Sequence, residues 1–262
     1  MPNPWFAQSE PGDEPGTRLF CLPYAGGNAS AYRTWRDLAP EHVRVHPLEL
    51  PGRGTRWSET PVSRMSLITE MLADALAGHL DQPYALFGHS MGGLIAFELA
   101  RTLRERGLPQ PAHLFVSGTA APDLPRTRRP IHAAPDADVL EELRFLGGTP
   151  PELLADAGLM ELLLPALRAD FCVLETYEYR ALTPLAVPLT VFGGEADPLV
   201  ASGKLHLWLR QARDRSRLVL LPGDHFFLHS AVSDVLTTIT DALAGTAVRD
   251  AADAVGPSPG AF

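Results

Sequence analysis

Short apolar runs alternate with longer helical patterns along most of the chain. Strands are predicted over Arg18–Leu22, Val43–Leu48, Tyr84–Phe87, His113–Ser117, Leu189–Phe192 and Arg217–Leu221. Helices are predicted between or after them, over Met65–Leu80, Ser90–Arg106, Gly203–Ala212 and Leu228–Ala244. Alternation of this kind favours an α/β fold, in which a mostly parallel central sheet carries helices on both faces.

Residues 124–183 interrupt the alternation with one helical pattern after another. An apolar helical face ends at Gly147-Gly148, and Pro165 is expected to open the first turn of a later helix. A helical insertion between strands of an α/β domain is the natural form of a lid over the carboxyl edge of the sheet. An ordinary packed helical subdomain fits the same pattern, but the surplus of leucine favours an apolar chamber beneath a lid.

These patterns divide the chain into an α/β core with one insertion and two tails. The core is expected at residues 17–123 and 184–244, with the helical lid insertion at 124–183. Residues 1–16 are rich in proline, glycine and acid, so they are predicted to be a disordered leader. Residues 245–262 are predicted to be a disordered tail for the same reason.

Composition narrows the choice of compartment and partner. The net charge of −9 argues against a nucleic-acid partner, whose phosphates the chain would repel. The two cysteines, Cys21 and Cys172, give neither a disulfide framework nor the spacing of metal ligands, so a reducing compartment is the simpler choice. The N-terminus has no signal-peptide pattern, and no uncharged stretch approaches the length of a membrane span. A cytoplasmic protein with no metal site and no membrane partner is expected.

The pentapeptide Gly88-His89-Ser90-Met91-Gly92 fits the pattern G-x-S-x-G between a predicted strand and a predicted helix. A strand that runs straight into a helix needs a sharp turn, and glycines two residues before and after the apex remove side chains that would collide there. Ser90 is therefore a candidate nucleophile. Taken alone, a glycine-rich turn that happens to contain a serine explains the five residues equally well.

A serine nucleophile needs a general base and an acid that orients the base. Asp197 follows the predicted strand Leu189–Phe192, and His225 follows the next predicted strand. The order serine, acid, histidine is that of α/β-hydrolases. Glu195 is a rival acid, and His229 is the serious rival base. Asp197 alone is explained as a turn or helix-cap residue, but the three features together predict a serine hydrolase.

The tetrahedral intermediate of such an enzyme needs hydrogen-bond donors for its oxyanion. One is expected from the backbone N–H of Met91, which follows the nucleophile. The other is expected from the glycine-containing loop after the first strand, with the Ala25 N–H as our choice and Tyr24 and Gly26 as alternatives.

On these motifs the chain resembles the stand-alone type II thioesterases of polyketide and nonribosomal peptide biosynthesis. The resemblance covers about residues 17–244. The lid segment that ends in GGTP is its most specific part, because many unrelated hydrolases share the serine motif. The matching segments are Leu22–Gly27, Leu50–Gly54, Phe87–Gly93, Leu143–Pro150, Gly193–Pro198 and Gly223–Leu228.

The resemblance implies an α/β-hydrolase fold and removal of acyl groups from the phosphopantetheine arm of acyl or peptidyl carrier proteins. It implies that Ser90 attacks the thioester carbonyl, that His225 takes the proton, and that Asp197 orients His225. Water then releases the free acid from an acyl-Ser90 intermediate. No cofactor of the enzyme's own is implied, because the phosphopantetheine belongs to the substrate. A monomer is expected.

Arg126, Arg128 and Arg129 lie at the entrance to the predicted lid. Carrier proteins are commonly acidic, so docking on an acidic enzyme would need a local basic patch such as this one, with the phosphopantetheine phosphate as another target. A solvated run of charges in a loop is the alternative explanation of the cluster, and it is slightly favoured. Arg53 and Arg56 carry the same ambiguity.

Other functions are compatible with the same residues. A carboxylester hydrolase or an acyltransferase on this fold would use an identical serine, histidine and aspartate. A non-catalytic carrier-binding protein is a further alternative, against which the intact catalytic positions argue.

Overall fold

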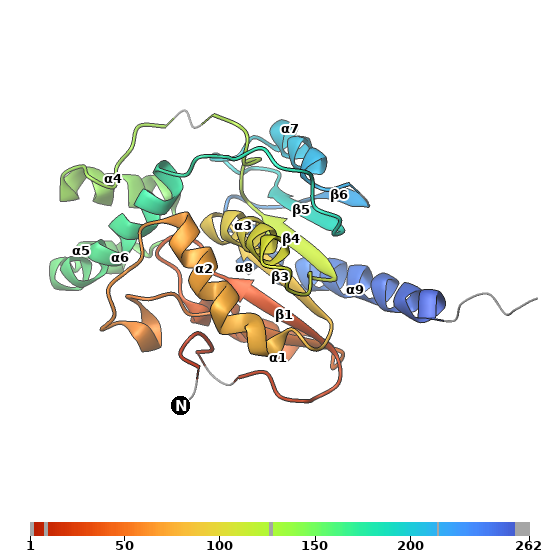
Figure 1. Cartoon of the computed structure of the whole chain (residues 1–262). Helices are drawn as coiled ribbons and strands as arrows, with labels where there is room; N and C mark the ends of the chain where they lie inside the picture. The colour runs from red at the N-terminus through yellow and green to blue at the C-terminus, as the bar shows by residue number, and fades with distance from the viewer. Residues whose placement is uncertain (1–2, 8–9, 126–127, 214, 255–262) are drawn as a thin grey trace, which may run out of the picture.

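The computed structural model has a single parallel sheet at its centre (Figure 1), and it describes residues 3–7, 10–125, 128–213 and 215–254. Within these ranges the strands are β1 Thr17–Leu22, β2 Val43–Pro47, β3 Tyr84–His89, β4 His113–Ser117, β5 Leu189–Gly194 and β6 Ser216–Leu221. Their spatial order is β2-β1-β3-β4-β5-β6, and every neighbouring pair is parallel. Parallel pairing brings all carboxyl ends to one edge of the sheet.

Both faces of the sheet are buried, and β1 shows how. Its side chains alternate in direction, so Leu19 and Cys21 join one apolar cluster while Phe20 and Leu22 join the other. The helices on the two faces are α2 Met65–Leu76 with α3 Met91–Glu105 on one side, and α1 Arg33–Leu38 with α9 Val232–Ala254 on the other. The expected α/β-hydrolase architecture, with a parallel sheet between helices, is confirmed.

Shorter elements complete the core. The predicted helix at residues 203–212 consists of α7 and a 3₁₀ turn, and the start of the predicted last helix is the separate helix α8. The short elements are η1 Ala29–Tyr32, η2 Gly54–Arg56, η3 Ala77–His79, α7 Ser202–Leu205, η4 His206–Gln211 and α8 Phe227–Ser230.

Three helices between β4 and β5 have an apolar cluster of their own. They are α4 Asp136–Leu146, α5 Pro151–Ala155 and α6 Ala157–Glu175, and Figure 1 shows them gathered beside one end of the sheet. The expectation that Pro165 begins a helix is wrong, because α6 starts at Ala157 and runs through that proline. Asp156 caps the start by accepting from the Leu159 N–H at 3.0 Å. Tertiary packing of α6 offsets the backbone hydrogen bond that Pro165 cannot donate.

The ends of the chain differ from the expected disordered tails where they are described. Trp5 and Phe6 are buried in the core, Phe6 forms a bridge to Leu48, and the Arg56 guanidinium lies 4.2 Å above the Trp5 ring. Burial of two aromatic rings outweighs the proline- and glycine-rich composition of the leader. At the other end α9 continues to Ala254, so the boundary predicted at Gly245 lies too early. Alanine-rich sequence carries the helix past that glycine.

Candidate active site

The turn between β3 and α3 holds Ser90 in a backbone conformation that L-residues rarely adopt, with φ +52° and ψ −116°. A Cβ on Gly88 would lie 1.9 Å from the Gly92 carbonyl oxygen, and a Cβ on Gly92 would lie 2.2 Å from that of Leu22. The Ser90 N–H donates to the Ser117 carbonyl at 2.7 Å. The two glycines are therefore required by packing, and the serine motif is the strained turn that the sequence predicts.

Asp197 and His225 meet at the carboxyl ends of β5 and β6. Asp197 Oδ2 lies 2.8 Å from His225 Nδ1, and the two side chains are 0% and 5% exposed. The other carboxylate oxygen accepts from the backbone N–H groups of Leu199 and Val200, at 2.8 and 3.2 Å. One carboxylate thus caps the turn after β5 and orients the imidazole, so the two interpretations of Asp197 are compatible.

The rival acid and base lie elsewhere. Glu195 is exposed, and it is Asp197 that contacts His225. The His229 ring stacks on Phe226, and its Nε2 lies 3.3 Å from the Tyr24 hydroxyl. Burial lowers the pKa of His229. Neither rival forms an acid–histidine pair with the other among the described residues.

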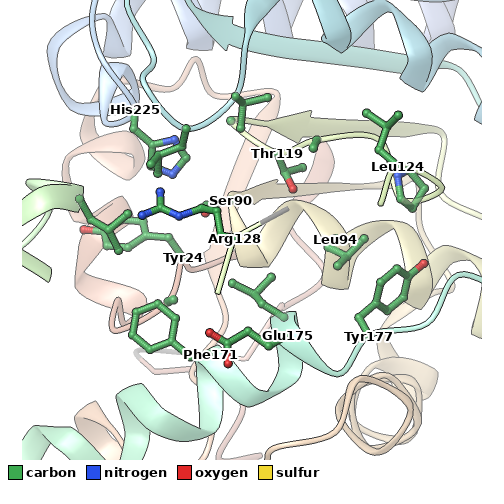
Figure 2. Close-up of a pocket in the computed structure, with 18 of the residues that line it drawn as sticks. Tyr24, Ser90, Leu94, Thr119, Leu124, Arg128, Phe171, Glu175, Tyr177 and His225 are labelled. Atoms are coloured by element: carbon green, nitrogen blue, oxygen red, sulfur yellow. The ribbon is translucent and has the colours of Figure 1, made fainter. Parts of the chain in front are cut away.

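Ser90 and His225 line the same cavity, and Figure 2 shows both side chains at its edge, with His225 beside the hydroxyl-bearing turn. The hydrogen bonds of the described residues include none between the Ser90 hydroxyl and the His225 ring. The hydrogen bond between Asp197 and His225 of the candidate triad is therefore formed in this structure, and the one between His225 and Ser90 is not. Catalytic hydrogen bonds are often long in free enzymes and shorten when substrate binds.

His89, inside the serine motif, is not among the residues that line the cavity. It is fully buried, and its Nδ1 lies 2.9 Å from the Ser117 hydroxyl. Burial holds the pKa of His89 well below its ordinary value, and the nearby His225 and His229 lower it further. Its ring centre lies 5.0 Å from that of His225. A neutral ring in this position does not oppose positive charge on His225.

The backbone N–H groups near Ser90 differ in whether they already donate a hydrogen bond. Ala25 lines the cavity, and Met91 is the first residue of α3. The N–H groups of Ala25 and Met91 donate no hydrogen bond to any described residue. The Gly26 N–H, by contrast, donates to Asp170 Oδ2 at 2.7 Å. Gly26 is thereby removed from the alternatives for the oxyanion donor, while Tyr24 and Ala25 remain.

The cavity measures about 620 Å³, and its wall combines apolar side chains with charged ones such as Asp123 and Glu142. Helix α6 contributes Phe171 and Leu174 to this wall. The carboxylate of Glu175, on the same helix, accepts from the backbone N–H groups of Ile131 and His132 at 2.8 and 3.0 Å. The other apolar lining residues include Leu94, Leu124, Leu146, Leu199 and Val200.

The arginines predicted for docking have different surroundings. Arg126 lies outside the described residues. Arg128 and Arg129 line the cavity mouth, and their side chains are 49% and 78% exposed and paired with Glu142 and Asp138 at 2.5 and 3.6 Å. Arg53 and Arg56 are buried, so they offer no docking surface to a large partner.

Sequence reasoning missed Asp170, which is fully buried in α6 and contacts the loop after β1. An acidic residue in an otherwise apolar helix was the available signal, because buried carboxylates are almost always paired. The described residues contain no group of three or more histidine, cysteine or acidic side chains placed to hold a metal ion, and none of their helices is long and apolar enough to cross a membrane.

The parallel sheet, the strained serine turn at the end of β3 and the buried acid–histidine pair after β5 and β6 define a protein of the α/β-hydrolase class. The sequence model of the "Thioesterase domain" family matches residues 17–243. The chain belongs to this thioesterase family, and the expected class of enzyme, a serine-type thioester hydrolase, is confirmed.

Relatives and solved structures agree with this family. The chain is 42% identical to the gramicidin S biosynthesis protein GrsT of Aneurinibacillus migulanus, over 89% of this chain and 91% of that protein. It is 34% identical to the thioesterase PikA5 of Streptomyces venezuelae, over 95% and 88% of the two chains. Among solved structures, the RedJ thioesterase of the prodiginine pathway in Streptomyces coelicolor is 40% identical with a TM-score of 0.82, and the match covers 90% of this chain and 96% of that one. The type II thioesterase BorB of the borrelidin cluster is 34% identical with a TM-score of 0.83, covering 93% and 99%. The predicted resemblance to type II thioesterases is confirmed.

Proposed function

We propose that this chain is an editing thioesterase that hydrolyses acyl groups from the phosphopantetheine arm of acyl or peptidyl carrier proteins. The observation that carries the proposal is the buried Asp197–His225 pair, whose histidine lines the same cavity as Ser90. Similar solved structures of proteins from NRPS/PKS biosynthetic pathways support it.

In the proposed mechanism the Ser90 hydroxyl attacks the thioester carbonyl while His225 Nε2 takes its proton. Asp197 Oδ2 holds the Nδ1–H of that ring, which fixes the tautomer and stabilises the imidazolium. The oxyanion of the tetrahedral intermediate accepts from the Ala25 and Met91 N–H groups, the latter at the positive end of α3. Collapse breaks the carbon–sulfur bond and leaves an acyl group on Ser90.

Hydrolysis of the acyl-enzyme is the second half of the reaction, and it returns the enzyme to its starting state. The phosphopantetheine thiolate leaves readily, because a thiol has an ordinary pKa of about 8.5, and it departs with the proton that His225 held. Water then attacks the acyl-Ser90 ester, and the neutral His225 takes the proton from the water and delivers it to Ser90 Oγ. The free acid departs and the Ser90 hydroxyl is restored, so no cofactor of the enzyme's own enters the reaction.

The cavity supports the choice of an acyl substrate. Apolar side chains of α6 form its wall, and residues 124–183 act as a lid in this proposal. Arg128 and Arg129 at the mouth are offered as contacts for an acidic carrier or for the phosphopantetheine phosphate. The proposal also takes the enzyme to be cytoplasmic, since its two cysteines form no disulfide, and to act as a monomer.

The experiment compares one acyl group on three supports: a carrier protein, pantetheine, and an oxygen ester. We expect the carrier-bound thioester to give the highest kcat/KM and the oxygen ester the lowest. Preference for the oxygen ester would assign the chain to the carboxylester hydrolases, and acyl transfer to an added alcohol in place of hydrolysis would assign it to the acyltransferases. Failure of a fluorophosphonate probe to label Ser90 would leave a carrier-binding role alone.

A further inference from the structure

Helix α6 rests directly on the backbone of the loop that follows β1. Asp170 accepts from the Gly26 N–H through Oδ2 at 2.7 Å. Leu167, one turn earlier on the same face of α6, lies so close that a Cβ on Gly26 would be 2.6 Å from its Cδ2 atom. Gly26 has φ +75°, a conformation that also favours glycine. The lid helix therefore contacts this loop at two points with no side chain of Gly26 between them.

An ion pair connects the same carboxylate to a third segment. Arg53, which follows β2, donates from Nη1 to Asp170 Oδ2 at 2.6 Å and from Nη2 to Oδ1 at 2.7 Å. Its Nη1 also donates to the Gly27 carbonyl at 3.3 Å. The two side chains are 7% and 1% exposed. The pair thus holds both the N–H of Gly26 and the carbonyl of Gly27, the two residues that follow Ala25.

A contribution to folding stability does not by itself explain the Arg53–Asp170 ion pair. A buried ion pair gains little over well-packed apolar side chains of the same volume, because both charges lose their hydration. Its forked geometry instead fixes direction, since a guanidinium and a carboxylate joined by two hydrogen bonds permit one relative orientation. The orientation of the peptide between Ala25 and Gly26, beside the proposed oxyanion site, is therefore fixed.

We propose that Arg53 and Asp170 are positioning residues that fix the loop after β1, so that the Ala25 N–H is aimed at the oxyanion only while α6 is seated on Gly26. The inference rests on the proposed function, in which Ala25 donates to the oxyanion. Removal of one oxyanion donor typically lowers kcat by about 10²–10³. A displaced donor is expected to lose a comparable fraction of the rate.

The first test compares two separate variants with the parent. One is Asp170→Asn. The other is the double variant Arg53→Met, Asp170→Leu, which removes both charges and keeps a similar side-chain volume. With an acyl-pantetheine thioester we expect kcat to fall by about 10² in each, with KM within about 3-fold of the parent. The pH at half-maximal kcat/KM should stay where it is, because the Asp197–His225 pair is not touched. A merely structural role would instead lower the amount of folded enzyme and leave kcat per folded molecule unchanged.

A second arginine–carboxylate pair, close to Arg53 in the sequence, provides a control. Arg56 also makes a two-bond pair, with Nε and Nη2 at 2.7 and 2.6 Å from the Glu59 carboxylate, but that carboxylate contacts neither α6 nor the loop after β1. Glu59→Gln is therefore expected to keep kcat within about 2-fold of the parent.

A double variant that folds, with a urea midpoint near that of the parent, and that keeps kcat within about 3-fold would overturn the inference. Where the double variant is insoluble, Arg53→Lys decides, because lysine keeps the charge and loses the fork. We expect about a 10-fold lower kcat in that variant, and a kcat equal to that of the parent would also overturn the inference. Failure of the proposed function is distinguishable, since the parent itself would then hydrolyse no carrier-bound thioester.

Discussion

Asp197 and His225 form a buried pair in which Oδ2 and Nδ1 are 2.8 Å apart, although their strands β5 and β6 are separated in sequence by the turn and helices that follow Asp197. The carboxylate is held from its other side by two backbone N–H groups. A carboxylate with three hydrogen-bond partners is fixed in direction, which is what the orienting acid of a serine hydrolase requires.

Asp197→Asn should lower kcat by about 10³-fold or more, because an amide presents its N–H₂ or its oxygen to the ring with no charge to stabilise the imidazolium. Steady-state hydrolysis of an acyl-pantetheine thioester measures this. Glu195→Gln, two residues away and exposed, is the control and should leave kcat unchanged. A loss below 10-fold in Asp197→Asn would argue that another acid orients His225.

Gly88→Ala should prevent the serine turn from forming. The new Cβ would lie 1.9 Å from the Gly92 carbonyl, so the turn must distort, and we expect a loss of roughly 4 kcal/mol or more of unfolding free energy. Gly78→Ala is the matched control, because nothing lies within 4 Å of that position. It should be neutral or stabilise by about 0.4–1 kcal/mol. Urea denaturation of both variants provides the comparison, and equal midpoints would contradict the steric argument.

Neutralising the cavity mouth should affect large substrates more than small ones. Arg128→Gln with Arg129→Gln is expected to raise KM for a carrier-bound thioester by about 10-fold and to change acyl-pantetheine hydrolysis by less than about 2-fold. Arg180→Gln is the control, since Arg180 is exposed and pairs with Glu105 on α3. Equal effects on both substrates would remove the docking role of these arginines.

Unfolding should become easier as the pH falls from about 6.5 to about 4. Burial, with Arg217 nearby, lowers the pKa of His113 from 6.5 to about 4, and burial with Arg36 and Arg18 does the same for His46. Between those pH values the unfolded chain binds the extra protons, so stability rises with pH across this window and the dependence from these groups ends below pH 4. Each group contributes on the order of 3 kcal/mol.

His113→Phe tests the pH argument. The His113 ring stacks on Phe115 with centres 4.2 Å apart, and its Nε2 lies 2.9 Å from the Thr190 hydroxyl. A phenyl ring keeps the stacking, removes the titratable group and loses this hydrogen bond, so the slope with pH is compared rather than the absolute stability. Urea midpoints measured between pH 4 and 7 should fall less steeply toward acid in this variant. A slope identical to that of the parent would show that His113 is not protonated on unfolding in this range.

The sheet and the serine turn were predictable because their determinants are local. Each predicted strand lies within two residues of an observed one, since apolar runs bounded by turn residues mark buried parallel strands. The turn has no room for a Cβ at positions 88 and 92, and the sequence places Gly88 and Gly92 there. Asp197 and His225 could be selected because the carboxyl ends of parallel strands meet at one edge of the sheet.

Features that depend on distant partners were not predictable. Trp5 and Phe6 are ordered by packing against the core, which the composition of the leader does not reveal. Helix α6 continues through Pro165 because its other turns are supported by tertiary contacts. Arg53 and Asp170 are 117 residues apart, and no local pattern connects an arginine in a loop to an acid in a helix.

Intact-mass analysis of the enzyme during turnover of an acyl-carrier thioester tests whether Ser90 is the nucleophile. We expect a burst of free carrier thiol equal to the enzyme concentration, and a mass increase equal to one acyl group that peptide mapping places on Ser90. Ser90→Ala should show neither, while remaining folded. Thiol release at the parent rate by Ser90→Ala, or an acyl group located on another residue, would show that Ser90 is not the nucleophile.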